Sequence, residues 1–345
     1  MEQGRGAGLT RNSAVDLIKM IAILGVVMIH TCCYDAAVLS FDWTSAVILR
    51  CMVSASVPLF FMCSGALLLN PQKKLTIKRL FTRNLPRIIV AMLVWAMLYQ
   101  IYDLIVGQCF SMENLIHAMK EVLVFKQKFH LYFLHILIAV YLWTPVTRVL
   151  VAHASRRELQ YALGLWFALG ILYPMLCGRW PFTLMTDYPK QWMLNATYTA
   201  IGYGVAGYYL TTYQMNWKHS IILILTGFAI VLGGTIWLSY QAGTLRPDYL
   251  EGEALGMALL AFGLFGFLTG KPQWGNHTVV QYLAKASFCV YLVHVFVLSL
   301  FQRLGLRPIT PYLLTIPVLT VANVAVSCIA YELLRRIPLV KDWLI

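Results

Sequence analysis

The chain has 345 residues, of which 60% are hydrophobic and only 12% are charged, with a mean hydropathy of +0.70. A soluble protein carries about twice that charged fraction, so the composition excludes the soluble classes and indicates an integral membrane protein. The 27 lysines and arginines outnumber the 14 acidic residues and give a net charge of +13. These basic residues cluster in short loops between apolar runs, which is typical of topology determinants and not of nucleic-acid binding.

Ten apolar segments of spanning length follow one another along the chain. They cover residues 14–36, 45–69, 80–104, 131–149, 157–176, 195–212, 219–240, 253–270, 284–303 and 312–334. We therefore predict an all-α, polytopic integral membrane protein of about ten transmembrane helices, forming a single domain over residues 1–345. The first segment has a basic flank but no small-residue cleavage site, so we expect a retained helix and not a removed signal peptide.

The basic residues are distributed unequally between the two sets of loops. An even number of spans puts both termini on one side, and the loops on that side hold 18 lysines and arginines against 8 in the opposite loops. Because positive loops stay in the cytoplasm, both termini are predicted to be cytoplasmic. The loops near 105–130, 177–194 and 241–252 then face outward. A disulfide between Cys109 and Cys177 is possible on that side.

The first apolar segment carries three ionisable groups on one helix face. Lys19 and His30 are eleven residues apart, which is about 20° beyond three full turns and about 16 Å of rise. Asp16 falls about 40° to the other side of the same stripe. Ionisable groups in a membrane helix indicate a functional site, although Asp16 and Lys19 also fit a helix entry at the headgroups.

The second and third segments add a broken helix and a basic run. Pro58 and the Ser64-Gly65 pair interrupt an apolar helix, which fits either a cavity-lining break or close helix packing. The next stretch, KKLTIKRLFTRNLPRI, places six basic residues at the cytoplasmic entry of the third segment. They fit simple topology determinants, but their density and the position of Arg87 beyond Pro86 favour an anion pocket for a phosphorylated ligand.

Histidines also occur in the fourth and ninth segments. His130 lies at the outer end of the fourth segment and is our candidate for binding an acceptor, whereas His135 is predicted to be a core residue. Tyr291 and His294 are three residues apart on one face, which fits either a site or a buried hydrogen-bonded pair. The sequence has no phosphate-binding glycine loop and no zinc-protease motif, and we predict no metal site.

Together these stretches resemble acyltransferase family 3, a family of membrane O-acyltransferases. The resemblance rests on D-L-I-K at 16–19 followed by His30, on V-P-L-F-F-M-C-S-G at 57–65, on H-L-Y-F-L at 130–134 and on S-F-C-V-Y-L-V-H at 287–294. The matches follow the family's order over almost the whole chain. Within the family, the chain is similar to the enterobacterial common antigen O-acetyltransferase subgroup. It is also similar to the membrane half of vancomycin-resistance serine racemases, without a racemase domain.

The resemblance implies an enzyme of the inner cell membrane that moves an acetyl or other acyl group from cytoplasmic acyl-CoA to a hydroxyl of a cell-envelope glycan or related acceptor. Acetyl-CoA is then a donor substrate, no cofactor is bound, and nucleic acid is not a partner. The implied site comprises His30 as base or acyl carrier with Asp16, then Lys19, Lys78, Arg83 and Arg87 for acyl-CoA, and His130, Tyr132, Tyr291 and His294 for orienting the acceptor or thioester. The family's basic pair before the third helix is changed here, because its first position is Asn84 and the preceding Arg83 points about 100° away.

Two functions from other classes fit the same features. A transporter or permease without chemistry accounts for ten spans, a broken helix and buried ionisable residues. A sensing or amino-acid-uptake domain, as in racemase-fused relatives, is a further alternative. A requirement for CoA distinguishes them from an acyltransferase, because a carrier does not need a phosphate-binding cluster on one side only.

The predicted orientation can be tested by topology mapping. A reporter fused after Ile345 is expected to lie in the cytoplasm, because the charge bias keeps the basic loops inside. A cysteine introduced near Asp187, in a background without Cys109, is expected to react with an impermeant reagent in intact cells. An outward-facing C-terminus would place His30 near the cytoplasm and would exclude acyl transfer across the membrane.

Overall fold

The computed structural model describes residues 12–177 and 195–345, and every regular element within these ranges is a helix. The first half comprises α1 (Ser13–Thr31), α2 (Phe41–Val53), α3 (Ser56–Leu68), α4 (Ile77–Arg79), the π-helical turn η1 (Leu80–Asn84), α5 (Leu85–Val106), α6 (Met112–Leu123), the 3₁₀ turn η2 (Phe129–Leu131), α7 (Tyr132–His153), α8 (Arg156–Phe167), the π-helical turn η3 (Ala168–Leu172) and α9 (Tyr173–Leu176). The second half comprises α10 (Ala196–Thr212), α11 (Trp217–Ala242), α12 (Leu255–Thr269), the 3₁₀ turn η5 (Pro272–Asn276), α13 (Thr278–Arg303), α14 (Tyr312–Leu334) and α15 (Pro338–Trp343).

Eight helices or continuous helical stretches of the described chain are long and apolar enough to cross a bilayer. All ten apolar segments predicted from the sequence form helices. Those predicted at 195–212 and 253–270 form the shorter helices α10 and α12, of 17 and 15 residues. The protein is therefore an all-helical, polytopic membrane protein, as the composition predicts.

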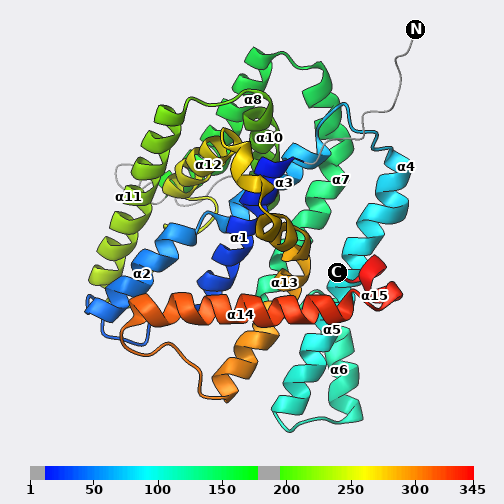
Figure 1. Cartoon of the computed structure of the whole chain (residues 1–345), viewed down its shortest axis with the longest axis vertical. Helices are drawn as coiled ribbons and strands as arrows, with labels where there is room; N and C mark the ends of the chain where they lie inside the picture. The colour runs from blue at the N-terminus through cyan, green and yellow to red at the C-terminus, as the bar shows by residue number, and fades with distance from the viewer. Residues whose placement is uncertain (1–11, 178–194) are drawn as a thin grey trace.

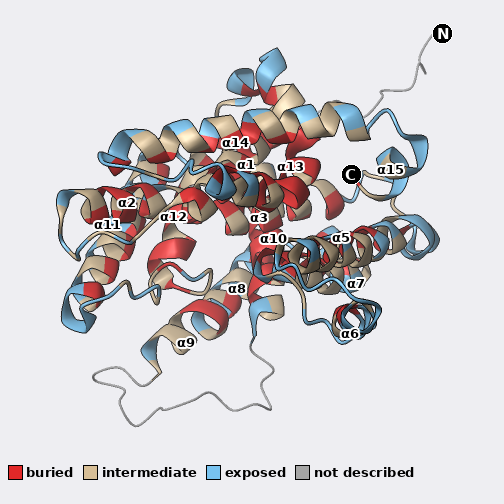
Figure 2. Cartoon of the chain, turned by 90° about the horizontal axis from the view of Figure 1, so that it is seen from below, coloured by how far each residue is buried: buried red, intermediate tan, exposed pale blue. Residues whose placement is uncertain are grey.

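The helices α1 and α13 pack against each other at the centre of the molecule (Figure 1). Burial separates central from peripheral helices, since 56% of the apolar window of α1 and 61% of that of α13 are buried, against 17% for α11. In Figure 2, seen from below, α14 runs along one edge of the bundle. Figure 1 shows the same helix crossing α1 and α13 at a steep angle. The chemistry-bearing helix α1 is thus enclosed by protein and not by lipid.

The two ends of the bundle differ in their side chains. We call the end where α1 begins and α4 lies the basic end, which carries Lys19, Lys73, Lys78, Arg79 and Arg148. The opposite end, where α5 meets α6, is called the α6 end (Figure 1). The helix α6 forms within the predicted loop 105–130, and the hydroxyl of Ser111 caps it by accepting the N–H of Asn114. The segment was predicted to be a connection between spans, and α6 is a short capped helix within that connection and is not one of the candidate spans. The predicted loop 177–194 lies outside the described residues, apart from Cys177.

The second predicted segment is divided into α2 and α3. The break falls at Ser54 and Ala55, and not at Pro58 or the Ser64-Gly65 pair as the sequence suggested. Proline has no N–H, and its ring clashes with the carbonyl group four residues earlier, which here belongs to Ser54. Pro58 therefore lies in the first turn of α3, where proline is tolerated, and Ser64 and Gly65 lie inside an unbroken helix.

Glycines bring the backbones of α3 and α10 into contact. A Cβ atom on Gly65 would overlap the carbonyl group of Gly204 in α10, and one on Gly207 would overlap the carbonyl group of Met62 in α3. Small residues at such crossings allow membrane helices to approach closely. Of the two sequence interpretations, close packing is therefore the one that applies to Gly65.

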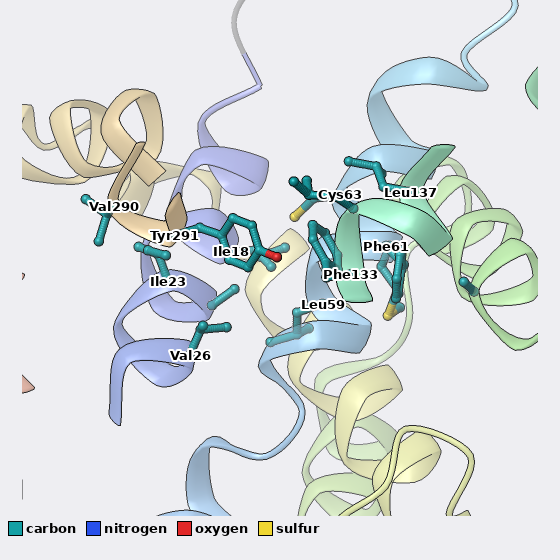
Figure 3. Packing of buried hydrophobic residues seen from close by; sticks show 14 of the residues in the cluster. Ile18, Ile23, Val26, Leu59, Phe61, Cys63, Phe133, Leu137, Val290 and Tyr291 are labelled. Carbon is teal, nitrogen blue, oxygen red and sulfur yellow. The ribbon is translucent and has the colours of Figure 1, made fainter. Parts of the chain in front are cut away.

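Apolar side chains of α1 and of three neighbouring helices pack against one another (Figure 3). They are Ile18, Ile23 and Val26 of α1, Leu59, Phe61 and Cys63 of α3, Phe133 and Leu137 of α7, and Val290 and Tyr291 of α13. All eight cysteines are free, so no disulfide joins Cys109 to Cys177. The interlocked core fixes how α1, α7 and α13 are rotated relative to one another, and these helices carry the polar groups described next.

Replacing Gly65 by alanine is expected to destabilise the fold. The added methyl group must displace the Gly204 backbone, and overpacking of this kind costs about 1–3 kcal/mol. The measurement is the temperature at which the detergent-solubilised protein loses its monodisperse elution peak. Gly233→Ala is the matched control, because a Cβ atom there meets no atom within 4 Å. Equal midpoints for the two variants would contradict the backbone contact between α3 and α10.

Candidate active site

A cavity of about 430 Å³ lies inside the bundle, within the size range of small-molecule sites of about 300–1,000 Å³. It is lined by residues from α1, α2, α3, α7 and α13, and from the connection between α11 and α12. Arg50, Ser54, Val57 and Pro58 all line it, so the break between α2 and α3 forms part of its wall. Irregular backbone at membrane depth is tolerated where it borders such a cavity.

Helix α1 places Lys19 and His30 on this one cavity. The helix begins where the side chain of Asn12 accepts the N–H of Val15, and it ends at Thr31, so Lys19 and His30 lie eleven positions apart in one unbroken helix. Their shared face was predicted from the spacing. The separation along the axis is about 16 Å, which puts Lys19 toward the basic end and His30 in the last turn.

Three histidine rings meet beside the last turn of α1. The ring centroids of His30 and His294 are 5.2 Å apart, and those of His294 and His130 are 5.5 Å apart. His30 comes from α1, His130 from η2 and His294 from α13. The tertiary structure thus joins three of the four sequence stretches, and the His294 ring lies next to both of the others.

The His294 ring has a defined tautomer. Its Nδ1 lies 2.7 Å from the carbonyl oxygen of Tyr291, and a carbonyl can only accept, so Nδ1 carries the proton of the neutral ring. The Nε2 atom then presents a lone pair, and it is buried without a hydrogen-bond partner. Asn323 donates to the carbonyl oxygen of His294 at 3.0 Å and holds this turn of α13 in place.

His130 is held from two sides and lies deeper than predicted. Its backbone carbonyl accepts the hydroxyl of Tyr291 at 2.6 Å, and the edge of the Tyr99 ring packs against its imidazole. His130 is only 1% exposed and both ring nitrogens lack a partner, so it is an enclosed member of the cluster and not a residue at an open mouth. The sequence predicted a position at the outer mouth, whereas the turn η2 that precedes α7 buries both His130 and Leu131.

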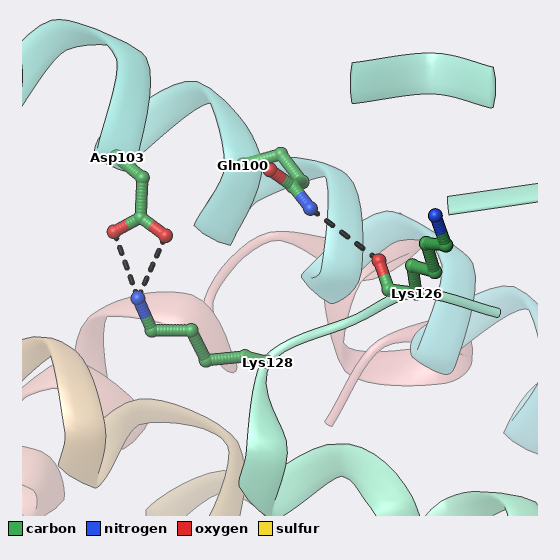
Figure 4. A network of polar contacts seen from close by, with 4 residues as sticks. All are labelled: Gln100, Asp103, Lys126 and Lys128. Carbon is green, nitrogen blue, oxygen red and sulfur yellow. Dashed lines mark hydrogen bonds and ion pairs between the residues drawn. The ribbon is translucent and has the colours of Figure 1, made fainter. Parts of the chain in front are cut away.

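Polar contacts fix the segment that leads into His130 (Figure 4). Lys128 donates to both carboxylate oxygens of Asp103, at 2.8 and 2.7 Å, and Gln100 donates to the backbone carbonyl of Lys126. Asp103 and Gln100 both belong to α5, so α5 anchors the connection between α6 and α7. The ion pair is partly exposed, and its role is to position the chain more than to add stability.

His30 and His130 both line the cavity, but their ring nitrogens differ in access. His30 makes no hydrogen bond with any described residue and its nitrogens are not enclosed, whereas the nitrogens of His130 and the Nε2 of His294 are enclosed without a partner. Of these three rings, His30 therefore has the nitrogens that a ligand in the cavity can reach. Among the described residues, no group of three or more His, Cys, Asp or Glu side chains is arranged to hold a metal ion.

At the basic end, Arg148 clamps the loop between α3 and α4. Its guanidinium donates to the backbone carbonyls of Leu68, Asn70 and Lys73. The clamp sets the position of Lys73, whose pKa is lowered by burial and then by the positive charges of Lys19 and Arg79, with a smaller contribution from Arg148. Cations from α1, α4 and this loop therefore converge near the Lys19 end of the cavity.

The residues predicted to bind acyl-CoA are only partly at the cavity. Lys19 lines it, whereas Lys78 and Arg83 are exposed on α4 and η1 and do not. Arg87 donates to the backbone oxygen of Ile345 and interacts electrostatically with Tyr141, which lines the cavity. The π-helical turn over 80–84 rotates this basic run in a way that an ideal helix of 3.6 residues per turn did not anticipate.

The other predicted residues divide between the two ends. Tyr132 and Tyr291 line the cavity beside His130. Asp16 lies in the first turn of α1, and fourteen residues of helix put it about 21 Å from His30. The charges of Asp16 and Lys19 both act on Cys63 of α3. Asp16 therefore belongs to the basic end and is not positioned to touch a group that reacts at His30.

Sequence reasoning missed three residues of the site. Arg50 and Glu251 line the cavity, and Arg148 shapes its basic end by holding the loop that carries Lys73, which the predicted basic run includes. Of the three, Arg50 had a sequence signal, since an arginine inside an apolar segment is expensive and indicates a site. The positions of Glu251 and Arg148 depend on contacts between distant helices.

Comparison with known proteins bears directly on this arrangement. The family model of acyltransferase family 3, described as an acyltransferase domain, matches residues 12–332, which include every residue that lines the cavity. The chain belongs to acyltransferase family 3. No curated protein and no solved structure matches it. The protein is therefore a membrane acyltransferase that transfers groups other than aminoacyl groups, and the cavity between Lys19 and His30 is the candidate place for that transfer.

Proposed function

We propose that the protein is an O-acyltransferase of the inner cell membrane that uses acyl-CoA, and acetyl-CoA in particular, to acylate a hydroxyl of a cell-envelope glycan or related acceptor. The observation that carries the proposal is the single cavity with Lys19 toward the basic end and His30, open to ligands, at the other. The donor enters at the basic end, which the charge bias assigns to the cytoplasm. The acceptor enters from the side of the α6 end.

The donor's phosphates bind at the basic end. Coenzyme A carries several phosphate charges, and Lys19, Lys73 and Arg79 approach one another there without an intervening ion pair among the described residues. Crowded cations repel one another, so a polyanion that neutralises them is favoured. Arg87 adds positive charge at Tyr141, farther along the cavity wall. The uncharged pantetheine arm then extends along α1 toward His30.

His30 performs the proton transfer. Acting as a base, it takes the proton of the acceptor hydroxyl while the hydroxyl oxygen attacks the thioester carbon. The carbon–sulfur bond then breaks, and the leaving thiolate takes the proton from His30. As an acyl carrier, a nitrogen of His30 would itself attack the thioester carbon, the carbon–sulfur bond would break, and the thiolate would leave with the ring proton. The acceptor hydroxyl would then attack the acyl-imidazole, break the nitrogen–acyl bond and return its proton to the ring. Both routes need a neutral ring that touches the cavity.

The residues around His30 orient the reacting groups. His294 presents the lone pair of Nε2 next to the His30 ring, and its tautomer is set by the Tyr291 carbonyl. Tyr291 also holds the backbone of His130. The exposed ring of Tyr132 lines the cavity, where it is placed to contact an acceptor. These are positioning roles, because only His30 has ring nitrogens open to a ligand.

A carrier without chemistry would also account for a polar cavity inside a bundle. Membership of an acyltransferase family and an open histidine beside a second ring favour transfer over transport. The convergence of cations at one end adds a site for an anionic donor, which a carrier of neutral or zwitterionic solutes does not require.

Replacing His30 by alanine is expected to lower acyl transfer by at least about 100-fold, because general acid–base catalysis contributes about 10²–10⁴ in rate. The measurement is transfer of labelled acetyl groups from acetyl-CoA into the envelope fraction of membranes that contain the native acceptor. His135→Ala is the matched control, since His135 contacts Gln127 and does not line the cavity. A wild-type rate for His30→Ala at normal protein levels would refute the mechanism.

Neutralising Lys73 is expected to weaken donor binding and leave the chemical step intact. Loss of one charged hydrogen bond costs about 1.5–3 kcal/mol, so Lys73→Gln should raise the KM for acetyl-CoA by about tenfold or more with little change in kcat. Lys19→Gln should behave in the same way. Lys73→Arg keeps the charge and should retain most of the affinity.

Lys78→Gln is the control for this experiment, because Lys78 is exposed and its charge is not among those that act on Lys73. A larger effect at Lys78 than at Lys73 would instead support the phosphate site predicted from the sequence. A collapsed kcat with unchanged KM in Lys73→Gln would remove Lys73 from the binding role. Arg83→Gln tests separately whether Arg83 replaces the basic residue that is missing at Asn84.

A further inference from the structure

Arg50 carries an unsatisfied positive group into the cavity. It lies in the last turn of α2 and lines the cavity, and its Nη1 atom is buried without a hydrogen-bond partner. It forms no ion pair with any residue in the described ranges. A guanidinium within a spanning segment is costly unless an anion or several acceptors surround it. The carbonyls at the end of α2 offer only a partial negative charge.

Arg50 lies near two groups of the proposed reaction site, His30 and Tyr132. Its charge interacts with the His30 ring and with the hydroxyl of Tyr132. Buried polar atoms are normally satisfied, so the orphaned Nη1 atom of a guanidinium on the cavity wall indicates a place for a polar ligand.

The ligand at Arg50 is not the donor's phosphate. The donor's charges belong at the basic end with Lys19, about 16 Å along α1 from His30. The part of acyl-CoA that reaches His30 is the uncharged pantetheine arm with its thioester. Glu251, whose charge also acts on Tyr132, forms no ion pair with Arg50 among the described residues, so the acceptor is left to supply the anion at the guanidinium.

We propose that Arg50 binds a carboxylate or phosphate group of the acceptor and thereby sets its hydroxyl beside His30. The acceptor is then an acidic hydroxyl compound, such as a sugar acid or a sugar phosphate unit. Glu251 lines the same cavity from the connection between α11 and α12, and its carboxylate accepts hydrogen bonds from the acceptor's other hydroxyls. The inference rests on the proposed O-acyltransferase function and specifies its substrate class.

The test is equilibrium binding to the full-length protein in lipid nanodiscs. The probes are methyl glucoside, glucuronate and glucose 6-phosphate, which differ in charge and share a sugar ring. Wild-type protein is expected to bind at least one anionic probe about tenfold or more tightly than the neutral one, because a charged hydrogen bond is gained. The two anionic probes distinguish a carboxylate from a phosphate. Arg50→Gln should abolish this preference, and Arg50→Lys should keep part of it.

Binding of acetyl-CoA and of the neutral sugar is expected to stay within about twofold in Arg50→Gln. Arg303→Gln is the matched control, because Arg303 is an arginine at the end of α13 that does not line the cavity. Equal binding of neutral and anionic probes, binding of none of them, or an equal loss for all ligands in Arg50→Gln would overturn the proposal.

Acetyl transfer to the same probes is measured separately. Anion-selective binding that depends on Arg50 but gives no transfer would support the subsite and count against the proposed acyl transfer. Transfer to neutral and anionic probes with equal efficiency would support acyl transfer and overturn the role of Arg50. The failure of one inference is thus distinguishable from the failure of the other.

Discussion

The break between α2 and α3 is the constraint on which the cavity depends. Pro58 cannot donate a backbone hydrogen bond, and its ring crowds the carbonyl group of Ser54, which favours the break at Ser54 and Ala55. Pro145 and Pro317, by contrast, lie inside the unbroken helices α7 and α14. Inside a bilayer, an interrupted helix is stable only where protein or a polar cavity borders it. The interruption thus creates the wall from which Arg50 and Ser54 reach the cavity. The polar cavity therefore depends on Pro58 and on hydrogen-bond partners for the backbone groups beside it.

Close packing on both sides of this break keeps the chamber in shape. Contact between Gly65 and Gly204 brings α3 against α10, and interlocked apolar side chains bring α1 against α3 and α13. These contacts set the rotation of α1 and α13, and with it the 5.2 Å separation of the His30 and His294 rings. The protein therefore uses rigid, apolar surroundings to hold a few polar groups, which is how small-molecule sites are generally built.

Positive charge is divided along the cavity in a way that suits two anionic substrates, one with several negative charges and one with a single anionic group. At the basic end, Lys19, Lys73 and Arg79 crowd together, and Arg148 holds the loop that brings Lys73 there. Beside the histidines, the buried Nη1 atom of Arg50 has no hydrogen-bond partner. A donor with several phosphates is attracted to the first site by the number of cations, whereas a single guanidinium selects one anionic group. The uncharged middle of the cavity separates the two and leaves room for a neutral thioester arm.

The sequence alone determined the class of protein, the helices and the residues of α1. Hydropathy and charge bias are sums over local residues, so they predicted an all-helical membrane chain, and the eleven-residue spacing predicted that Lys19 and His30 share a cavity face. Only the tertiary structure decided which distant groups meet them. His130 is enclosed where η2 meets the bundle, Arg83 is exposed on a π-helical turn, and Lys73 is held at the basic end by Arg148, which binds the carbonyls of its loop. Such outcomes depend on contacts between helices far apart in the chain, and periodicity within one helix carries no information about them.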